Sequence, residues 1–237
     1  MADEAAGGIA NEIRRYIQSQ PAIRMVFAAA PSQAQMLSAL RQENGIDWTR
    51  VTAFHMDEYI GLPPNSPQRF GNWLRAAIFD HLPFGAVYLI DPGADPGRTA
   101  AEYAAKLNEA PIDIVCCGIG VNGHLAFNDP PADFDDPLTV KIVNLDAQCR
   151  QQQVDDRCFA TLNDVPTEAL TMTVPALLSA RTILCTVPGP AKREAVRRAL
   201  LGPIDPACPA SALRRHPSCT LYLDQDSAPG LPNLTAE

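Results

Sequence analysis

Short apolar runs rich in β-branched residues alternate with segments of helical pattern along most of the chain. This alternation is typical of βαβ units, in which parallel strands are joined by helices that pack on the sheet. We therefore expect an α/β protein built on an open, mostly parallel sheet. The sequence shows no internal repeat and no long linker, so its 237 residues are expected to form one domain over 1–237.

The pattern also predicts individual elements. The Pro- and Asp-rich segment 128–140 reads as a loop, either a mobile lid or a static turn, and the tail from 226 onward reads as loosely ordered. Strands are expected at 23–27, 48–54, 87–90, 112–117, 182–187 and 220–223, and helices at 4–20, 34 to about 42, 70–81, 98–107, 171–180 and 191–201.

Charge and composition exclude several classes of protein. The net charge is −8, and no basic cluster exceeds Arg214-Arg215, so we expect no nucleic-acid partner. No apolar run reaches the roughly 18 residues of a membrane span, and the acidic N-terminus lacks a signal-peptide core. The seven cysteines show no framework spacing, which favours reduced thiols and a cytoplasmic protein. An acidic protein of this kind needs a local cationic pocket to bind an anionic substrate.

Four of the expected strands end close to a residue that could do chemistry: Ser32, Asp57, His124 and Lys192. Ligands of open α/β sheets bind outside the carboxyl ends of the strands. We therefore expect these four side chains, although distant in sequence, to face one pocket.

Asp57 and Glu58 form an acid pair directly after an apolar strand. A carboxylate at the rim of an apolar pocket can have a raised pKa, which makes it a usable general base. The competing interpretation is a helix N-cap or a surface salt bridge. The flanking aromatic and turn residues favour a site.

His124 lies in the glycine-rich turn Gly118-x-Gly120-x-x-Gly123. The spacing resembles a dinucleotide fingerprint, but it comes mid-chain rather than on the first βα unit, so we expect the glycines to let backbone amides approach a ligand. A histidine can take and give a proton near neutrality. Asn122 and Asp129 are close enough in sequence to orient its ring. The alternative is a histidine that is simply packed in the loop.

Three cations could hold an anion. Lys192 falls in the first turn of an expected helix, where the dipole disfavours a cation unless an anion docks there. Arg150 and Arg157 lie near another expected helix. Each of the three could instead be a solvated surface residue.

Metal and serine chemistry lack support in the sequence. The four histidines, among them His55, His81 and His216, show no ligand spacing with Cys, Asp or Glu, and no G-x-S-x-G elbow is present. We therefore expect no metal and no cofactor.

Two segments, 54–63 (FHMDEYIGLP) and 118–130 (GIGVNGHLAFNDP), resemble signatures of the glucosamine-6-phosphate deaminase/isomerase family. Supporting matches are Val165-Pro166-x-x-Ala169-Leu170-Thr171, Lys192 after a Pro-Gly-Pro turn, and His216-Pro217. The resemblance runs from about residue 26 to 224.

The resemblance implies a three-layer α/β/α fold on a doubly wound, mostly parallel sheet of Rossmann-like type. It also implies a metal-free isomerisation that converts glucosamine 6-phosphate and water into fructose 6-phosphate and ammonia. It implies that His124 assists ring opening, with Asn122 and Asp129 beside it, and that Asp57 moves a proton from C2 to C1. Lys192 and one arginine, Arg150 or Arg157, would hold the phosphate. Further substrate contacts are expected from Ser32, Glu58, Gly120 and Gly123. A homo-oligomer is compatible with this family.

The chain departs from the family pattern at three places. Asn122 stands where an Asp is familiar, and because Asn cannot act as a charged relay, His124 is expected to depend more on Asp129. Asp129 stands where a Glu is usual and is one methylene shorter, so its hydrogen bond to His124 is expected to need a backbone shift or a water. The glycine-rich phosphate loop is replaced by Ala28–Gln33, in which Pro31 has no N–H. These departures keep two alternatives open: a related sugar-phosphate isomerase or lactonase on another substrate, and a non-catalytic sugar-phosphate-sensing domain.

Overall fold

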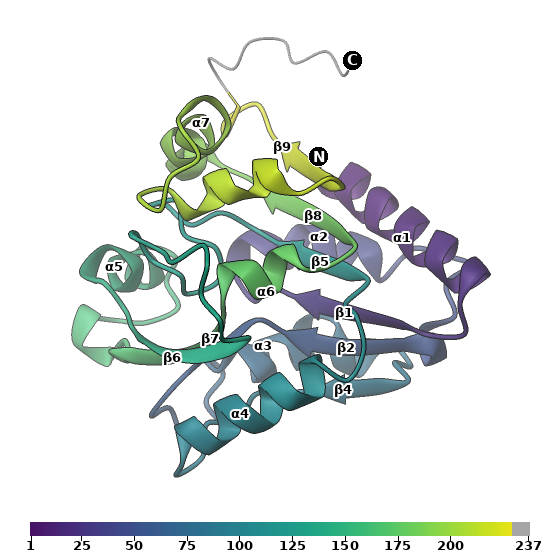
Figure 1. Cartoon of the computed structure of the whole chain (residues 1–237), viewed down its shortest axis with the longest axis horizontal. Coiled ribbons are helices and arrows are strands. Elements are labelled where there is room, and N and C mark those ends of the chain that lie inside the picture. Colours follow the sequence, from purple (N-terminus) through teal and green to yellow (C-terminus); the bar gives the residue numbers. More distant parts are fainter. Residues whose placement is uncertain (229–237) are drawn as a thin grey trace.

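A computed structural model describes residues 1–228 and contains a six-stranded parallel sheet (Figure 1). The spatial order of its strands is β4-β2-β1-β5-β8-β9, and every neighbouring pair is parallel. The predicted fold class is confirmed. The strands are β1 (Ile23–Phe27), β2 (Val51–His55), β4 (Ala86–Tyr88), β5 (Ile114–Cys117), β8 (Thr182–Val187) and β9 (Cys219–Leu223).

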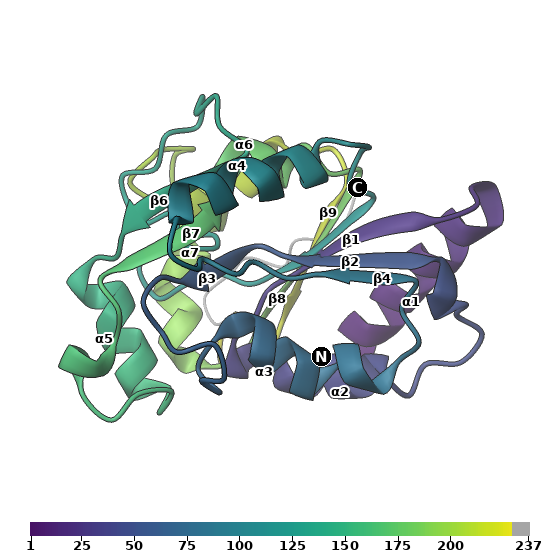
Figure 2. The same cartoon turned by 90° about the horizontal axis from the view of Figure 1, so that it is seen from below.

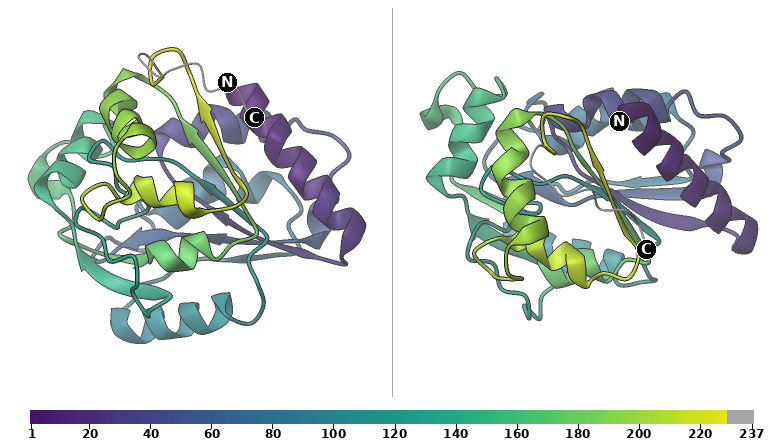
Figure 3. Two further views of the ribbon diagram at one scale, coloured as in Figure 1. Left: turned by 45° about the horizontal axis from the view of Figure 1, so that its top comes forward. Right: turned by 90° about the horizontal axis from the view of Figure 1, so that it is seen from above.

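Helices cover both faces of this sheet, which gives the expected three layers (Figure 2). One face carries α1 (Ala2–Ser19), α2 (Ala34–Leu40) and α3 (Phe70–Ala77); the other carries α4 (Pro96–Leu107), α6 (Val174–Leu178) and α7 (Arg193–Leu201). Helix α1 lies along the β8–β9 edge (Figure 3). Short 3-10 helices cover Pro31–Gln33, Trp48–Arg50, Phe79–His81, Leu162–Asp164, Pro190–Lys192 and Pro209–Arg215.

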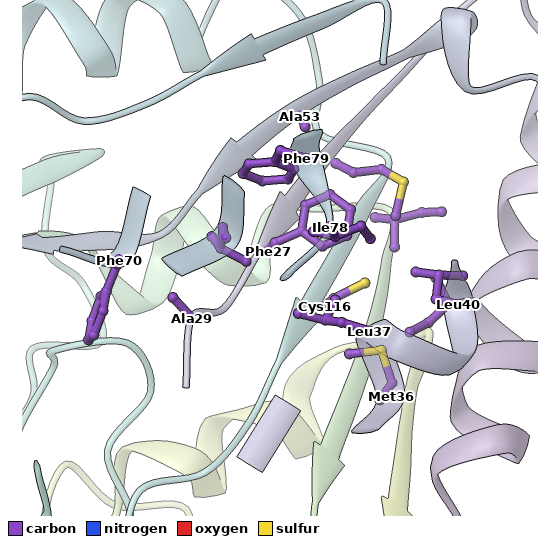
Figure 4. Close-up of a cluster of buried hydrophobic side chains, with 14 of the residues drawn as sticks. Phe27, Ala29, Met36, Leu37, Leu40, Ala53, Phe70, Ile78, Phe79 and Cys116 are labelled. Atoms are coloured by element: carbon purple, nitrogen blue, oxygen red, sulfur yellow. The ribbon is translucent and has the colours of Figure 1, made fainter. Parts of the chain in front are cut away.

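Burial of apolar side chains on both faces explains why these strands read as continuous apolar runs. All four residues of β5 and all six of β8 are buried, as expected for strands covered on both faces. On the face of α1–α3, Phe27 of β1 packs among side chains of α2 and of the turn after α3 (Figure 4). Each large apolar side chain buried in this way contributes about 1.5–3 kcal/mol.

The chain direction changes between β1 and β5. From β1 the chain runs outward through β2 to β4, then returns to β5 beside β1 and runs outward the other way through β8 to β9. A crevice for ligands opens at such a topological switch point, outside the carboxyl ends of the strands. The loops that follow β1 and β5, which carry residues 28–33 and 118–128, meet at this point.

A second, antiparallel sheet lies beyond the carboxyl ends of β1 and β2 (Figure 1). It consists of β3 (Asp57–Tyr59), β7 (Glu168–Met172) and β6 (Val140–Asn144), in the order β3-β7-β6. The local sequence pattern does not predict this second sheet. The expected helix at 171–180 was wrong at its start, because Thr171 and Met172 pair in β7 and the helix begins only after Thr173, whose side chain accepts the Ala176 N–H.

The other boundaries differ by a few residues. Residues 48–50 form a turn before β2, and the loop expected at 128–140 ends where β6 begins at Val140. The structure adds α5 (Ala147–Asp155), which lies beside the second sheet. Of the tail expected from 226, residue Ser227 is buried in a turn, and 229–237 lie outside the described residues. Within residues 1–228, no helix is both long and apolar enough to cross a bilayer.

Candidate active site

One pocket opens at the switch point, and Ser32, Asp57, His124 and Lys192 all line it. Their side chains come from the loop after β1, from β3 directly after β2, from the loop after β5 and from the turn before α7. The prediction that the four strand ends converge is therefore confirmed.

Asp57 is the buried acid of this pocket. Its side chain is only 5% exposed, and Oδ1 has no hydrogen-bond partner. Burial, reinforced by the neighbouring Glu58 charge, raises the pKa of the Asp57 carboxyl well above its usual range. When such a carboxyl is ionised, it is a stronger base than an ordinary aspartate.

Glu58 points away from the pocket. Its carboxylate accepts the backbone N–H groups of Tyr59 (2.9 Å), Phe70 (3.0 Å) and Gly71 (2.9 Å), and Arg69 Nε lies 3.8 Å from Oε2. It therefore caps the first turn of α3, which is the alternative that the sequence left open. The structure does not bring Glu58 to the pocket, because neighbouring residues of an extended strand face opposite sides.

The glycine-rich turn at 118–123 leaves the space that the His124 ring occupies. A Cβ on Gly120 would lie 2.2 Å from His124 Nε2, so only glycine leaves room for the ring. Gly123 has a φ of +93°, a backbone conformation that favours glycine, but it is not part of the pocket wall. Gly120 does line the pocket. Of the two predicted glycine contacts, only Gly120 is in place.

A carboxylate lies beside the other ring nitrogen. His124 Nδ1 is 3.2 Å from Asp129 Oδ1, although the two atoms are not aligned as a hydrogen bond. The shorter Asp129 side chain therefore reaches the ring without forming an aligned hydrogen bond, and the expected backbone shift or bridging water stays a prediction. Burial raises the Asp129 pKa, but the contact with His124, the Asn122 amide and the Asp146 N–H outweigh it, and the net pKa is below its usual value.

Asn122 forms hydrogen bonds with both the Asp129 side chain and the His124 backbone. Its Nδ2 donates to Asp129 Oδ1 (2.9 Å) and Asp146 Oδ2 (3.1 Å), and its Oδ1 accepts the His124 backbone N–H (3.0 Å). An aspartate here would repel both carboxylates. Asn122 is thus a positioning residue in this chain.

The three candidate cations differ in position. Lys192 is only 7% exposed in the pocket wall, and burial lowers its pKa to about 8; among residues 1–228 no carboxylate forms an ion pair with it. Arg157 is exposed and lines a second cavity of about 280 Å³ that shares Ala29, Ala30 and Phe70 with the first. Arg157 therefore lies beside the pocket, in the adjoining cavity.

Arg150 does not reach the pocket. Its guanidinium donates to the carbonyls of Leu162 (2.6 Å) and Val165 (2.9 Å), which ties α5 to the following loop. Because these carbonyls occupy its donors, the prediction that Arg150 binds substrate is corrected to a structural role.

Sequence reasoning missed three buried glutamines in the pocket wall. Gln33 donates to the Thr186 carbonyl (3.0 Å), and its Oε1 is buried without a partner. Gln152 accepts the Val121 N–H (3.0 Å), and Gln153 lies next to it. Gln33 could have been predicted from the sequence, because it directly follows the candidate residue Ser32. The other two belong to α5, whose polar sequence resembles that of a surface helix.

Fold and site together define an α/β protein with an acid–base pocket and a buried cation at its switch point. Residues 1–222 match the family described as glucosamine-6-phosphate isomerases/6-phosphogluconolactonase. The chain belongs to this family of enzymes.

Individual relatives agree with this assignment. The chain is 35% identical over 211 residues to the glucosamine-6-phosphate deaminases of Bacillus thuringiensis (strain Al Hakam) and Bacillus anthracis (strain A0248), which covers 89% of this chain and 78% of each relative. Among solved structures, a monomeric glucosamine-6-phosphate deaminase superposes with a TM-score of 0.87 at 28% identity, over 95% of this chain and 93% of that one. The 6-phosphogluconolactonase of Trypanosoma brucei shares the fold, with a TM-score of 0.79 at 18% identity over 98% and 96% of the two chains.

Proposed function

We propose that this protein converts glucosamine 6-phosphate and water into fructose 6-phosphate and ammonia. The observation that carries the proposal is the convergence on one pocket of a buried carboxyl, Asp57, a histidine beside a carboxylate, His124, and a buried cation, Lys192. Within the described part of the chain, Lys192 has no carboxylate partner. The similarity to glucosamine-6-phosphate deaminases supports the choice of reaction.

Ring opening is assigned to His124. The step breaks the bond between C1 and the ring oxygen, and it moves a proton from the C1 hydroxyl to that oxygen. His124 can relay this proton because Asp129 lies at Nδ1 and Nε2 faces Gly120 in the pocket wall. Asn122 positions Asp129 relative to His124, because it donates to the Asp129 carboxylate and accepts the His124 backbone N–H.

Isomerisation is assigned to Asp57. Its carboxylate takes the proton from C2 of the open chain and returns it at C1, while one proton of the C2 ammonium group passes to the C1 oxygen. C1 thereby becomes a hydroxymethyl group and C2 an iminium carbon. Water adds to this carbon, and ammonia leaves. The ammonium group of the bound substrate and Lys192 bring positive charge towards Asp57, which favours the ionised carboxylate despite burial.

The phosphate is assigned to Lys192, Ser32 and Arg157. Lys192 and Ser32 line the pocket, and Arg157 lies in the adjoining cavity across Ala29 and Ala30. A buried ammonium without a carboxylate partner is well placed to bind a dianion. Arg157 is preferred over Arg150 because the Arg150 guanidinium is already bonded to carbonyls.

The loop Ala28–Gln33 motivates a second candidate, a lactonase acting on a related sugar phosphate. Pro31 has no N–H, and the Gln33 N–H already bonds to the Ala30 carbonyl, so this loop has few amides for a phosphate. Lactone hydrolysis needs an activated water but no proton transfer between carbons. The proton transfer assigned to Asp57 would not be needed for it. A sensing domain would bind the sugar phosphate without turnover.

The test compares Asp57→Asn and His124→Gln with Asp80→Asn, which changes an exposed carboxylate that forms an ion pair with Arg75. We expect the first two to lose ammonia release by about 10²–10⁴-fold, because each removes a general acid–base group, and to stay folded by circular dichroism. The control should match the wild type. A folded Asp57→Asn protein with full activity would refute the assigned role, and lactone hydrolysis that survives this change would favour the second candidate.

A further inference from the structure

Three different metal-ligating groups meet next to the pocket. A ring nitrogen of His124, a carboxylate oxygen of Asp129 and Sγ of Cys149 all lie within 4.8 Å of one another. Among residues 1–228, no other group of three or more His, Cys, Asp or Glu residues brings its ligand atoms together in this way. Cys149 comes from α5, which packs over the loop that carries the other two residues.

One ligand atom of this cluster is available. His124 is only 9% exposed, and its Nδ1 has no hydrogen-bond partner, although Asp129 Oδ1 lies 3.2 Å from it. In a tetrahedral site with metal–ligand bonds of about 2.0–2.3 Å, the ligand atoms are roughly 3–4 Å apart. The longest separation in the cluster therefore needs to contract by at most about 1–2 Å to hold an ion.

The donor set selects the metal. Imidazole nitrogen, carboxylate oxygen and thiolate sulfur together suit Zn²⁺, whereas Mg²⁺ prefers oxygen ligands and water. The thiol of Cys149 is kept protonated by burial and by the carboxylates of Asp129 and Asp146, which raise its pKa. On binding, the ion would take the place of the thiol proton, which leaves to solvent. The resulting thiolate and the Asp129 carboxylate would balance the two charges of the ion.

We propose that His124, Asp129 and Cys149 form an inhibitory Zn²⁺ site. An ion on Nδ1 would separate the ring from Asp129 and hold its lone pair, so that His124 could no longer relay a proton. The inhibitory consequence rests on the proposed function of His124, whereas the binding itself does not. Three protein ligands leave a fourth position of the ion for water.

The experiment titrates the metal-free protein with Co²⁺, whose thiolate complexes give a charge-transfer band in the near ultraviolet. We expect one equivalent to produce the band and one equivalent of Zn²⁺ to remove it. Cys149→Ser should abolish the band, and Asp129→Asn should weaken binding by at least roughly tenfold. The matched control is Cys219→Ser, because Cys219 is a half-buried thiol near Cys117 and Cys185, away from the cluster. It should keep the band.

Activity gives the second readout. Zn²⁺ at one equivalent should stop ammonia release by the wild type, a chelator should restore it, and Mg²⁺ should have no effect. For each variant the ratio of activity with and without Zn²⁺ is compared, so a change in basal rate does not matter. The site would be overturned if the wild type gave no band, if Cys149→Ser kept the band, or if Cys219→Ser lost it. The wild-type result is decisive even if a variant fails to fold. Full ammonia release with the ion bound would overturn the inhibitory role and also the assignment of His124.

Discussion

Replacement of Gly120 by alanine tests how closely activity depends on the place of the His124 ring. The added Cβ would lie 2.2 Å from Cε1 and Nε2 of the ring, whereas ordinary contacts begin at 3.4 Å. The ring must therefore retreat by about 1.2 Å from its place in the pocket. A misplacement of about 1 Å typically costs on the order of 10²-fold in rate, so we expect kcat for ammonia release to fall by about that factor.

The matched control is Gly7→Ala in α1, where the nearest atom to the new Cβ is 3.9 Å away. This change should leave kcat unaltered and stabilise the protein by up to about 1 kcal/mol, because alanine favours a helix over glycine. Both variants are assayed for kcat and for urea unfolding. A folded Gly120→Ala protein whose kcat stays within about threefold of wild type would show that the rate does not depend on the position of the His124 ring.

Two further predictions concern charge. Burial lowers the Lys192 pKa to about 8, so the cation is present below that pH and lost above it. We therefore expect kcat/KM for a phosphorylated substrate to fall as the pH rises through about 8, and we expect Lys192→Arg to remove this fall because arginine stays charged. An unchanged pH profile in Lys192→Arg would contradict the assignment of Lys192 to the phosphate. Glu58→Ala removes the acceptor of three backbone N–H groups and should lower the free energy of unfolding, measured in urea, by about 2–4 kcal/mol. The control Glu102→Ala, on an exposed helix face, should lower it by less than about 0.5 kcal/mol. Equal effects of the two changes would contradict the capping role of Glu58.

The sequence predicted the main sheet because its strands are buried on both faces and carry little but apolar residues, as in Ile114–Cys117. It did not predict the second sheet, because β3 is the short polar segment Asp57–Tyr59 and Glu168–Met172 has no strong alternation. Pairing between β3 and β7 depends on contacts between residues more than a hundred positions apart. Such pairing is a tertiary property that local pattern does not carry.

For the site, the residue types were predictable, but not every orientation was. Asp57 and Glu58 are both acids after an apolar strand, yet only Asp57 faces the pocket, since the backbone there is extended. Arg150 and Arg157 were equivalent by sequence until the carbonyls bonded to Arg150 were known. Cys149 approaches His124 only through the packing of α5, which no spacing indicates.

The most direct test of the account is the stoichiometry of products from glucosamine 6-phosphate. Ammonia and fructose 6-phosphate are measured in the same tube with purified wild-type protein. The proposed acid–base pocket predicts that both appear in equal amounts and that neither appears with Asp57→Asn. Folded wild-type protein that forms neither product, while it hydrolyses a phosphorylated lactone or only binds the sugar phosphate, would contradict the account.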